Sequence, residues 1–368
     1  ALLAACSVLI ITCPCAFGMA TPMSIAVASG LAARHGILIK NGAVLETLSD
    51  ITHFVFDKTG SLTEGRMAVQ EVRPVAGFDT DTLLLKAAAV ERYSEHHIAR
   101  AIVEEARTRG LNPTAPSMEN FAGTPGLGVA GTVDGTTVLL GNETWLVRHG
   151  IAPAVTMQDG IDELERRGIT CIHVALDGVH AGFIAIADRL RPDARALVDS
   201  LRAQGIRMTL LSGDRRRVAE AVAEQLGGME VIAEVLPEDK DRVIADLQRQ
   251  GERVAMTGDG VNDAPALIRA NVGIAIGSGT EVSAESADIV LISNELDKVN
   301  LATRLSHRTL RTIRQNIGIS LTYNVIMVPL AMAAFVTPLV AAISMPISSL
   351  LVIGNAARIR TLFANRRE

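Results

Sequence analysis

The sequence predicts an α/β fold, in which a doubly wound parallel sheet receives an inserted second domain and is attached to membrane-spanning helices. Short apolar segments that end in polar or glycine turns alternate with amphipathic helical segments, as a doubly wound sheet requires. Asp, Glu, Lys and Arg are absent from residues 1–33 and again from residues 315–357. Each of these runs exceeds the roughly 20 residues that an α-helix needs to cross a bilayer.

The composition indicates a folded chain with more than one domain. The chain has 368 residues, of which 48% are hydrophobic and 20% charged, and its formal net charge is −5. A chain this apolar buries a sizeable core and is not disordered. Its four cysteines are too few for a disulfide framework. Because the slightly acidic balance lacks the basic surplus of nucleic-acid-binding proteins, no nucleic-acid partner is expected.

The two uncharged runs are expected to be membrane helices with cytoplasmic flanks. The second run is long enough to cross twice, and Thr337-Pro338 near its middle is a suitable hairpin turn. Basic residues flank the runs, which indicates the cytoplasmic side: Arg34, Lys40, Arg304, Arg308, Arg311, Arg314, Arg358 and Arg360. A buried core helix of a soluble protein is the alternative. A signal peptide is disfavoured because the first run lacks a basic leader, so we expect part of a larger multi-pass membrane protein.

Five apolar segments are expected to form the parallel sheet. They are Ile51–Phe56, Ile206–Leu211, Val254–Thr257, Val272–Ile276 and Ile289–Ile292. Helical apolar spacing occurs in Arg215–Leu226 and Asp239–Gln250. An insertion from about Met67 to Ala187 follows the first strand. Its helices are expected near Thr80–Arg109 and Ile161–Arg167, and its strands near Val129–Leu140 and Thr170–Asp177.

Polar motifs follow these strands, at the sheet edge where open α/β sheets bind their ligands. They are Asp57-Lys58-Thr59-Gly60-Ser61-Leu62-Thr63, Ser212-Gly213-Asp214, Lys240 after Pro237, and Gly258-Asp259-Gly260-Val261-Asn262-Asp263. A carboxylate can accept a phosphoryl group, a lysine and hydroxyls can hold its oxygens, and two further carboxylates can hold Mg²⁺. The four motifs together therefore predict a phosphoryl-transfer site.

These motifs resemble those of P-type ATPases, which have a haloacid-dehalogenase-like fold, and the resemblance covers nearly the whole chain. It implies that ATP phosphorylates Asp57, that Lys240 binds the phosphate and that Asn262 assists. The magnesium site that it implies consists of Asp57, Thr59, Asp259 and Asp263. The remaining catalytic positions are Lys58, Ser212, Gly213 and Asp214. The family usually has threonine where this chain has Ser61 and Ser212, but serine keeps the hydroxyl.

One position separates a pump from a phosphatase of the same fold. Such phosphatases commonly carry a second aspartate two residues after the nucleophile, and here that residue is Thr59. Without a carboxylate to activate water, an aspartyl phosphate at Asp57 should persist long enough to drive a conformational change. Thr59 therefore favours a pump over a membrane-tethered phosphatase, which remains an alternative.

The insertion resembles the nucleotide-binding domain of the heavy-metal class of these ATPases. Glu91 and His96 match the glutamate and histidine of that class's ATP site, and Gly126 and Gly128 match its glycine pair. Glycine lets the backbone approach a nucleotide closely. The class has proline after the histidine, whereas this chain has His97, which changes the local backbone preference.

Cys13-Pro14-Cys15 in the first uncharged run indicates a metal site. Proline removes a helical hydrogen bond, so the helix should open there and place two sulfurs beside the break. Thiolates favour soft metals. The motif resembles the metal-binding helix of heavy-metal ATPases. The further ligands that the Cu⁺-transporting subgroup implies are Tyr323, Asn324, Met345 and Ser349. Because residues 315–357 carry no charge, Cu⁺, together with Ag⁺, is expected in preference to Zn²⁺ or Cd²⁺.

The resemblance thus implies ATP-driven Cu⁺ export through an aspartyl phosphate, with ATP and Mg²⁺ as cofactors, a bacterial inner membrane as location and delivery of Cu⁺ by a copper chaperone. A Zn²⁺ or Cd²⁺ pump and a non-catalytic metal-binding membrane fragment are further alternatives. No actuator domain, earlier helices or N-terminal metal-binding domains occur in the 368 residues. The expected divisions are a transmembrane helix with its stalk (1–45), a phosphorylation domain in two parts (46–66 and 188–299), a nucleotide-binding domain (67–187), a second stalk (300–314), two transmembrane helices (315–357) and a cytoplasmic tail (358–368).

Overall fold

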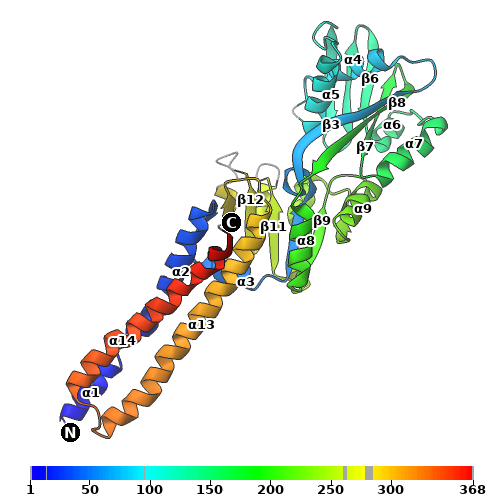
Figure 1. Cartoon of the computed structure of the whole chain (residues 1–368). Helices are drawn as coiled ribbons and strands as arrows, with labels where there is room; N and C mark the ends of the chain where they lie inside the picture. The colour runs from blue at the N-terminus through cyan, green and yellow to red at the C-terminus, as the bar shows by residue number, and fades with distance from the viewer. Residues whose placement is uncertain (1, 14, 95, 260–262, 278–284, 367–368) are drawn as a thin grey trace.

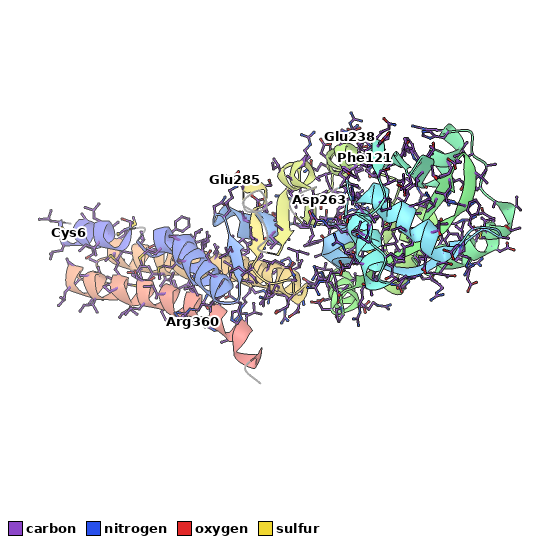
Figure 2. The ribbon with its side chains drawn as sticks, turned by 90° about the horizontal axis from the view of Figure 1, so that it is seen from above. Cys6, Phe121, Glu238, Asp263, Glu285 and Arg360 are labelled. Carbon is purple, nitrogen blue, oxygen red and sulfur yellow. The ribbon has the colours of Figure 1, made fainter. Side chains whose placement is uncertain are left out.

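The computed structural model is elongated, with a helical bundle at one end, a six-stranded sheet at the other and a seven-stranded sheet between them (Figure 1). Seen from above, Cys6 marks the bundle end, and Glu238, Asp263 and Phe121 lie near the middle of the molecule (Figure 2). The structure describes residues 2–366 except 14, 95, 260–262 and 278–284, and the side chains of residues 15, 16 and 363–366 are also left undescribed.

The seven-stranded sheet has the order β1-β13-β12-β11-β2-β9-β10 and is parallel except for β1. Its strands are β1 (Ile37–Ile39), β2 (His53–Asp57), β9 (Arg207–Leu211), β10 (Glu230–Ile232), β11 (Val254–Gly258), β12 (Val272–Ile276) and β13 (Ile289–Leu291). The five expected strands are therefore present. The strands β1 and β10, with three residues each, were not among the expected strands.

Both faces of this sheet are covered, as the continuous apolar strands require. Phe54 and Phe56 stack at 5.7 Å on one face, against helices α3 (Ala43–Ser49), α8 (Ala194–Ala203), α9 (Arg216–Gln225) and the first turns of α13 (Asp297–Met332). Val55 and Met256 point to the other face, against α10 (Lys240–Arg249) and α11 (Ala264–Arg269). Asp57 is paired with Leu211, and Phe56 with Thr257, so the ends of β2, β9 and β11 share one edge.

The six-stranded sheet is antiparallel, with the order β3-β8-β7-β6-β5-β4. Its strands are β3 (Thr63–Pro74), β4 (Met118–Thr124), β5 (Gly128–Val133), β6 (Thr136–Gly141), β7 (Thr170–Leu176) and β8 (Val179–Leu190). Helices α4 (Thr80–Glu91) and α5 (His97–Thr108) pack on one face, and α6 (Glu143–Arg148) and α7 (Val155–Arg166) on the other. The chain enters this inserted unit through β3 and leaves it through β8.

The bundle consists of α1 (Leu2–Ile11), α2 (Cys15–Arg34), the second half of α13 and α14 (Pro338–Ala357), which Figure 1 shows side by side. Among the described helices, one is long and apolar enough to cross a membrane, namely residues Pro338–Leu362. The other two expected spans do not meet that test. The first uncharged run is divided into α1 and α2, and the second half of α13 contains several polar residues, among them Gln315, Asn316, Tyr323 and Asn324.

Candidate functional site

Asp57 ends β2 and points into a buried site at the carboxyl edge of the seven-stranded sheet. The chain then turns sharply through Lys58–Leu62, where Gly60 has a φ of +76° and lies against Asp259. A residue with a side chain would be strained at this φ. The guanidinium of Arg191 donates to the carbonyl oxygens of Gly60 and Ser61, at 2.7 Å each. Arg191 therefore fixes the turn that carries the residues after Asp57.

Lys240 joins two carboxylates across this site. Its Nζ donates to Oδ1 of Asp57 and to Oδ1 of Asp263, each at 2.6 Å. Lys240 begins α10 and Asp263 precedes α11, so two helices of the same face bring these groups to the end of β2. All three side chains are buried. The arrangement is a cationic group held where an added phosphoryl group on Asp57 would need one.

The carboxylates of Asp57, Asp259 and Asp263 outnumber the single ammonium group of Lys240 that lies among them. Burial, followed by the nearby Asp263 carboxylate, raises the pKa of Asp57 to about 7, although Lys240 acts in the opposite direction. Burial also raises the pKa of Asp263, and Asp259 adds to that effect. A carboxylate cluster with raised pKa values is poised to bind a cation, because the cation relieves its repulsion.

Lys58 and Asp214 form a second buried ion pair beside Asp57. The Asp214 carboxylate also accepts a hydrogen bond from Ser212 Oγ at 2.9 Å. Burial acts to raise the pKa of Asp214, but the ion pair with Lys58 outweighs it, and the pKa is lowered. Gly213 lies between Ser212 and Asp214 in sequence, close to the carbonyl oxygen of Val235. The ion pair of Lys58 with Asp214 therefore fixes Lys58 next to Asp57.

The donor types at this edge fit Mg²⁺, which prefers carboxylate oxygens. Asp57 and Asp263 share Lys240, and the carboxylate of Asp259 is close enough to raise the pKa of both. As the side chains stand, no group of three or more His, Cys, Asp or Glu in the described chain is arranged to hold a metal ion. Thr59 is half-buried in the turn, and Asn262 lies outside the described residues.

The four expected nucleotide residues lie in the inserted unit. Glu91 is buried at the end of α4, and His96 is the exposed N-cap of α5, where its Nδ1 accepts a hydrogen bond from Ile98 N at 3.2 Å. Gly126 has a φ of +73°, and a Cβ there would lie 2.5 Å from a methyl carbon of Leu236. Gly128 is packed so closely against the backbone of the neighbouring strand that a Cβ would lie 2.2 Å from Leu140 O. Close packing therefore favours glycine at both positions, in addition to the role at a nucleotide that the resemblance implies.

The raised pKa of the buried Glu91 carboxyl group can be tested by unfolding the protein at two pH values. Burial raises its pKa from 4.5 to about 7. A raised pKa means that the carboxyl group stabilises the fold fully below pH 4.5 and that this contribution is lost as the pH rises through 7, by about 3 kcal/mol in total. Glu91→Gln should therefore be more stable than the wild type at pH 8 and not at pH 4.5, as measured by urea unfolding. Glu104→Gln should show no such difference, because the Glu104 side chain is exposed on the surface of α5. An equal difference at both pH values would contradict the raised pKa of Glu91.

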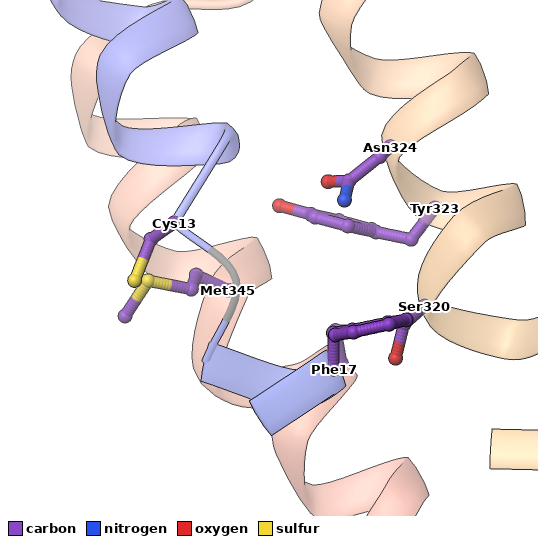
Figure 3. A pocket seen from close by; sticks show the side chains of 7 residues that line it. Cys13, Phe17, Ser320, Tyr323, Asn324 and Met345 are labelled. Carbon is purple, nitrogen blue, oxygen red and sulfur yellow. The ribbon is translucent and has the colours of Figure 1, made fainter. Parts of the chain in front are cut away.

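A pocket in the bundle brings together most of the expected metal ligands. Cys13, Phe17, Ser320, Tyr323, Asn324, Met345 and Ser348 line it. Figure 3 shows the Cys13 and Met345 side chains on one side of this pocket, with Tyr323 and Asn324 projecting from α13 toward them. The chain between α1 and α2 is not helical at Thr12 and Cys13, which gives the Cys13 side chain access to the pocket.

Two buried polar atoms in this pocket have no hydrogen-bond partner among the described residues: Asn324 Oδ1 and Ser348 Oγ. Buried polar atoms are usually satisfied, so these two are free to meet a ligand. Ser349 does not line the pocket, and its Oγ donates to Met345 O at 3.3 Å in its own helix. Cys15 begins α2, but its side chain lies outside the described part of the chain. Cys13 is disulfide-bonded in the structure, so it would bind a metal ion only after reduction.

A known protein family matches more than half of the chain. The family of haloacid dehalogenase-like hydrolases matches residues 51–271, which include the described catalytic edge and the inserted unit. The chain belongs to this family. Its members have a wide range of substrates, so the site must be considered together with closer relatives.

This haloacid dehalogenase-like hydrolase is 44% identical over 98% of its length to a copper-transporting P-type ATPase of Rhizobium leguminosarum bv. viciae. It is 45% identical over 97% of its length to a probable copper-exporting P-type ATPase V of Mycobacterium tuberculosis. It covers 43% and 46% of these proteins, so the chain spans about half the length of the relatives it matches.

Solved structures show the same likeness. A zinc-transporting PIB-type ATPase in its E2·Pi state matches 95% of this chain with a TM-score of 0.72 and 38% identity, over 56% of that protein. The catalytic domain of the CPx-ATPase CopB-B matches 76% of this chain with a TM-score of 0.59 and 29% identity, over 98% of that domain. The haloacid dehalogenase-like hydrolase described above is therefore similar to the catalytic and membrane parts of metal ATPases.

Several residues of this hydrolase were not predicted from the sequence. Arg191 and Thr170 contact the motifs from outside them, and neither belongs to a recognisable pattern. At the bundle pocket, Ser348 is a lining residue, whereas the expected ligand was its neighbour Ser349. Consecutive helical residues point about 100° apart, and only the rotation of α14 in the bundle decides which one meets the pocket.

Proposed function

We propose that this chain is the catalytic and metal-binding part of an ATP-driven Cu⁺ pump that works through a phosphorylated Asp57. The observation that supports this most directly is the buried Lys240 bridge between Asp57 and Asp263. In the same chain, an uncharged pocket holds a cysteine and a methionine sulfur. A phosphoryl-transfer edge and a soft-metal pocket in one chain are what such a pump requires.

In the proposed reaction, a carboxylate oxygen of Asp57 attacks the γ-phosphorus of ATP, and ADP leaves. Lys240, which already donates to Asp57, holds the negative charge of the transferred group. Asp57, Asp259, Asp263 and Thr59 would hold Mg²⁺, which supplies positive charge against the phosphate oxygens. Because Thr59 has no carboxylate, it cannot serve as a general base for water, and the aspartyl phosphate persists.

Chemistry supports Cu⁺ as the cargo. The pocket offers sulfur from Cys13 and Met345, with neutral groups from Tyr323, Asn324 and Ser348. A divalent ion beside a thiolate favours a further charged ligand, whereas Cu⁺ does not need one. The likeness to a solved zinc-transporting ATPase makes a Zn²⁺ pump the second candidate. Location in a bacterial inner membrane, several membrane passes and delivery of Cu⁺ by a chaperone remain part of the proposal.

Substitution of Met345 by aspartate tests the cargo. In the complete pump, ATP hydrolysis by membranes that contain the wild type should respond more to Cu⁺ or Ag⁺ than to Zn²⁺, and Met345→Asp should lose the Cu⁺ response first, because a carboxylate favours a divalent ion. Met332→Asp, which is 70% exposed at the end of α13, is the matched control.

A carboxylate in the bilayer costs about 2.5–3.5 kcal/mol on insertion scales, so the amount of each variant in the membrane is measured first. If Zn²⁺ but not Cu⁺ stimulates hydrolysis by the wild type, the copper assignment is wrong and the zinc pump is favoured. If neither ion stimulates it, the transport proposal itself is contradicted.

A further inference from the structure

Arg215 crosses from the seven-stranded unit to the inserted unit. It directly follows Asp214 and precedes α9, yet its guanidinium pairs with two carboxylates of the inserted unit, Glu165 at 2.8 Å and Glu143. The Glu165 side chain is only 2% exposed. A carboxylate buried to this extent needs a cation beside it. Arg215 therefore is the group that allows α7 to rest against α9.

Each end of this contact leads to a group that the proposed reaction uses. On one side, Asp214 pairs with Lys58, the neighbour of Asp57, and accepts a hydrogen bond from Thr170 Oγ1 at 3.2 Å. On the other side, Glu143 follows Asn142, whose side-chain Nδ2 donates to Gly126 O at 3.0 Å. Arg215 thus connects the sheet edge that carries Asp57 to the turn at Gly126 (the glycine turn), which belongs to the expected nucleotide site.

Other contacts along α9 support the same orientation. Arg217 pairs with Asp162 of α7 at 3.0 Å, and Gln225 Nε2 donates to Arg167 O at 3.2 Å. The glycine turn also meets the other unit directly, since Gly126 lies against Leu236, four residues before Lys240. The orientation of the inserted unit over the edge is therefore set by charges at α9 and by this apolar contact.

We propose that Arg215 is a positioning residue, which orients the inserted unit so that ATP held there presents its γ-phosphate to Asp57. This rests on the proposed function. Reactions of two bound partners depend strongly on their alignment, and a displacement of about 1 Å can lower a rate on the order of 100-fold. Loss of Arg215 should thus slow phosphoryl transfer more than it weakens ATP binding.

The test compares Arg215→Gln with Arg216→Gln in the full chain. Arg216 is the next residue and pairs only within its own helix, with Glu220 at 3.7 Å, among the contacts of the described chain. Acid-quenched labelling at saturating ATP measures the transfer rate, and isothermal titration measures ATP affinity. We expect Arg215→Gln to slow labelling on the order of 10- to 100-fold with ATP affinity nearly unchanged, and Arg216→Gln to match the wild type.

Further variants separate positioning from folding. Arg215→Lys keeps the charge and should restore part of the rate, although lysine cannot match the bidentate fork of arginine. Glu143→Gln leaves the Arg215–Glu165 pair in place and should give a smaller loss, so it serves if Arg215→Gln does not fold. Wild-type labelling rates in Arg215→Gln, or an equal loss of rate and ATP affinity, would overturn the inference.

Hydrogen–deuterium exchange without ATP separates this inference from the proposed function. Arg215→Gln should increase amide exchange in α7 and at the start of β7, and Arg216→Gln should not. If the wild type is not labelled by ATP, the proposed function fails, and exchange still decides whether Arg215 holds α7 against α9. Unchanged exchange in Arg215→Gln would contradict the orienting role whatever the labelling shows.

Discussion

Asp57→Asn is expected to abolish phosphorylation of the chain by Mg-ATP while leaving the fold intact. The amide has nearly the same shape as the carboxylate but lacks its nucleophilic charge. The fold should tolerate the change because Lys240 keeps its 2.6 Å contact with Asp263 and because one of several crowded negative charges is removed. We therefore expect labelling by radioactive ATP, followed by acid quench, to fall to background.

The control for this variant is Asp50→Asn, because Asp50 lies near the opposite end of β2 and pairs with exposed Arg253 at 3.7 Å. It should be labelled like the wild type. Labelling of Asp57→Asn equal to that of the wild type would show that the phosphorylated residue lies elsewhere. Circular dichroism of both variants establishes that the fold is retained.

The raised pKa of Asp57 gives the same variant a second signature. Since its pKa is raised from 3.8 to about 7, its carboxyl group stabilises the fold fully below pH 3.8, and this contribution is lost as the pH rises through 7. Without Mg²⁺, Asp57→Asn should accordingly melt at a higher temperature than the wild type at pH 8. The advantage should shrink toward pH 4 and when Mg²⁺ is added to the wild type.

The meeting of the carboxylates at one sheet edge could be predicted because local patterns determine it. Buried parallel strands are recognisable from their apolar runs, and parallel strands place their carboxyl ends at one edge. Asp57, Asp214 and Asp259 each follow such a strand, so their meeting is a consequence of topology. The bridge of Lys240 to both Asp57 and Asp263 depends in addition on how α10 and α11 pack, which no local pattern specifies.

The contacts between separate units could not be predicted in this way. Arg215 is the first of three consecutive arginines at the start of a helix, and nothing in the sequence indicates which of them faces another unit. Its partners Glu143 and Glu165 lie more than 45 residues away in two different helices. Long-range charge pairing is determined by the relative placement of α7 and α9, and that is a property of the folded chain.

Cys13→Ser is expected to remove high-affinity Cu⁺ binding by the chain, measured anaerobically with reductant present. Cys13 is the described cysteine that lines the bundle pocket, which Met345 lines as well (Figure 3). A serine hydroxyl is a hard donor and does not replace a thiolate for Cu⁺. The loss should exceed the roughly 10- to 100-fold that removal of an outer-shell partner causes. Cys15→Ser, from the same motif, should behave similarly.

Cys6→Ser is the matched control, because Cys6 is an exposed free thiol on α1, outside the pocket. It should bind Cu⁺ like the wild type, whereas ATP binding should be unchanged in all three cysteine variants. The comparison distinguishes a pocket from surface thiols, since either could hold Cu⁺ in an assay that counts bound metal alone. If Cys13→Ser with Cys15→Ser binds Cu⁺ as tightly as the wild type, the transported ion binds elsewhere, and the unpartnered oxygens of Asn324 and Ser348 need another explanation.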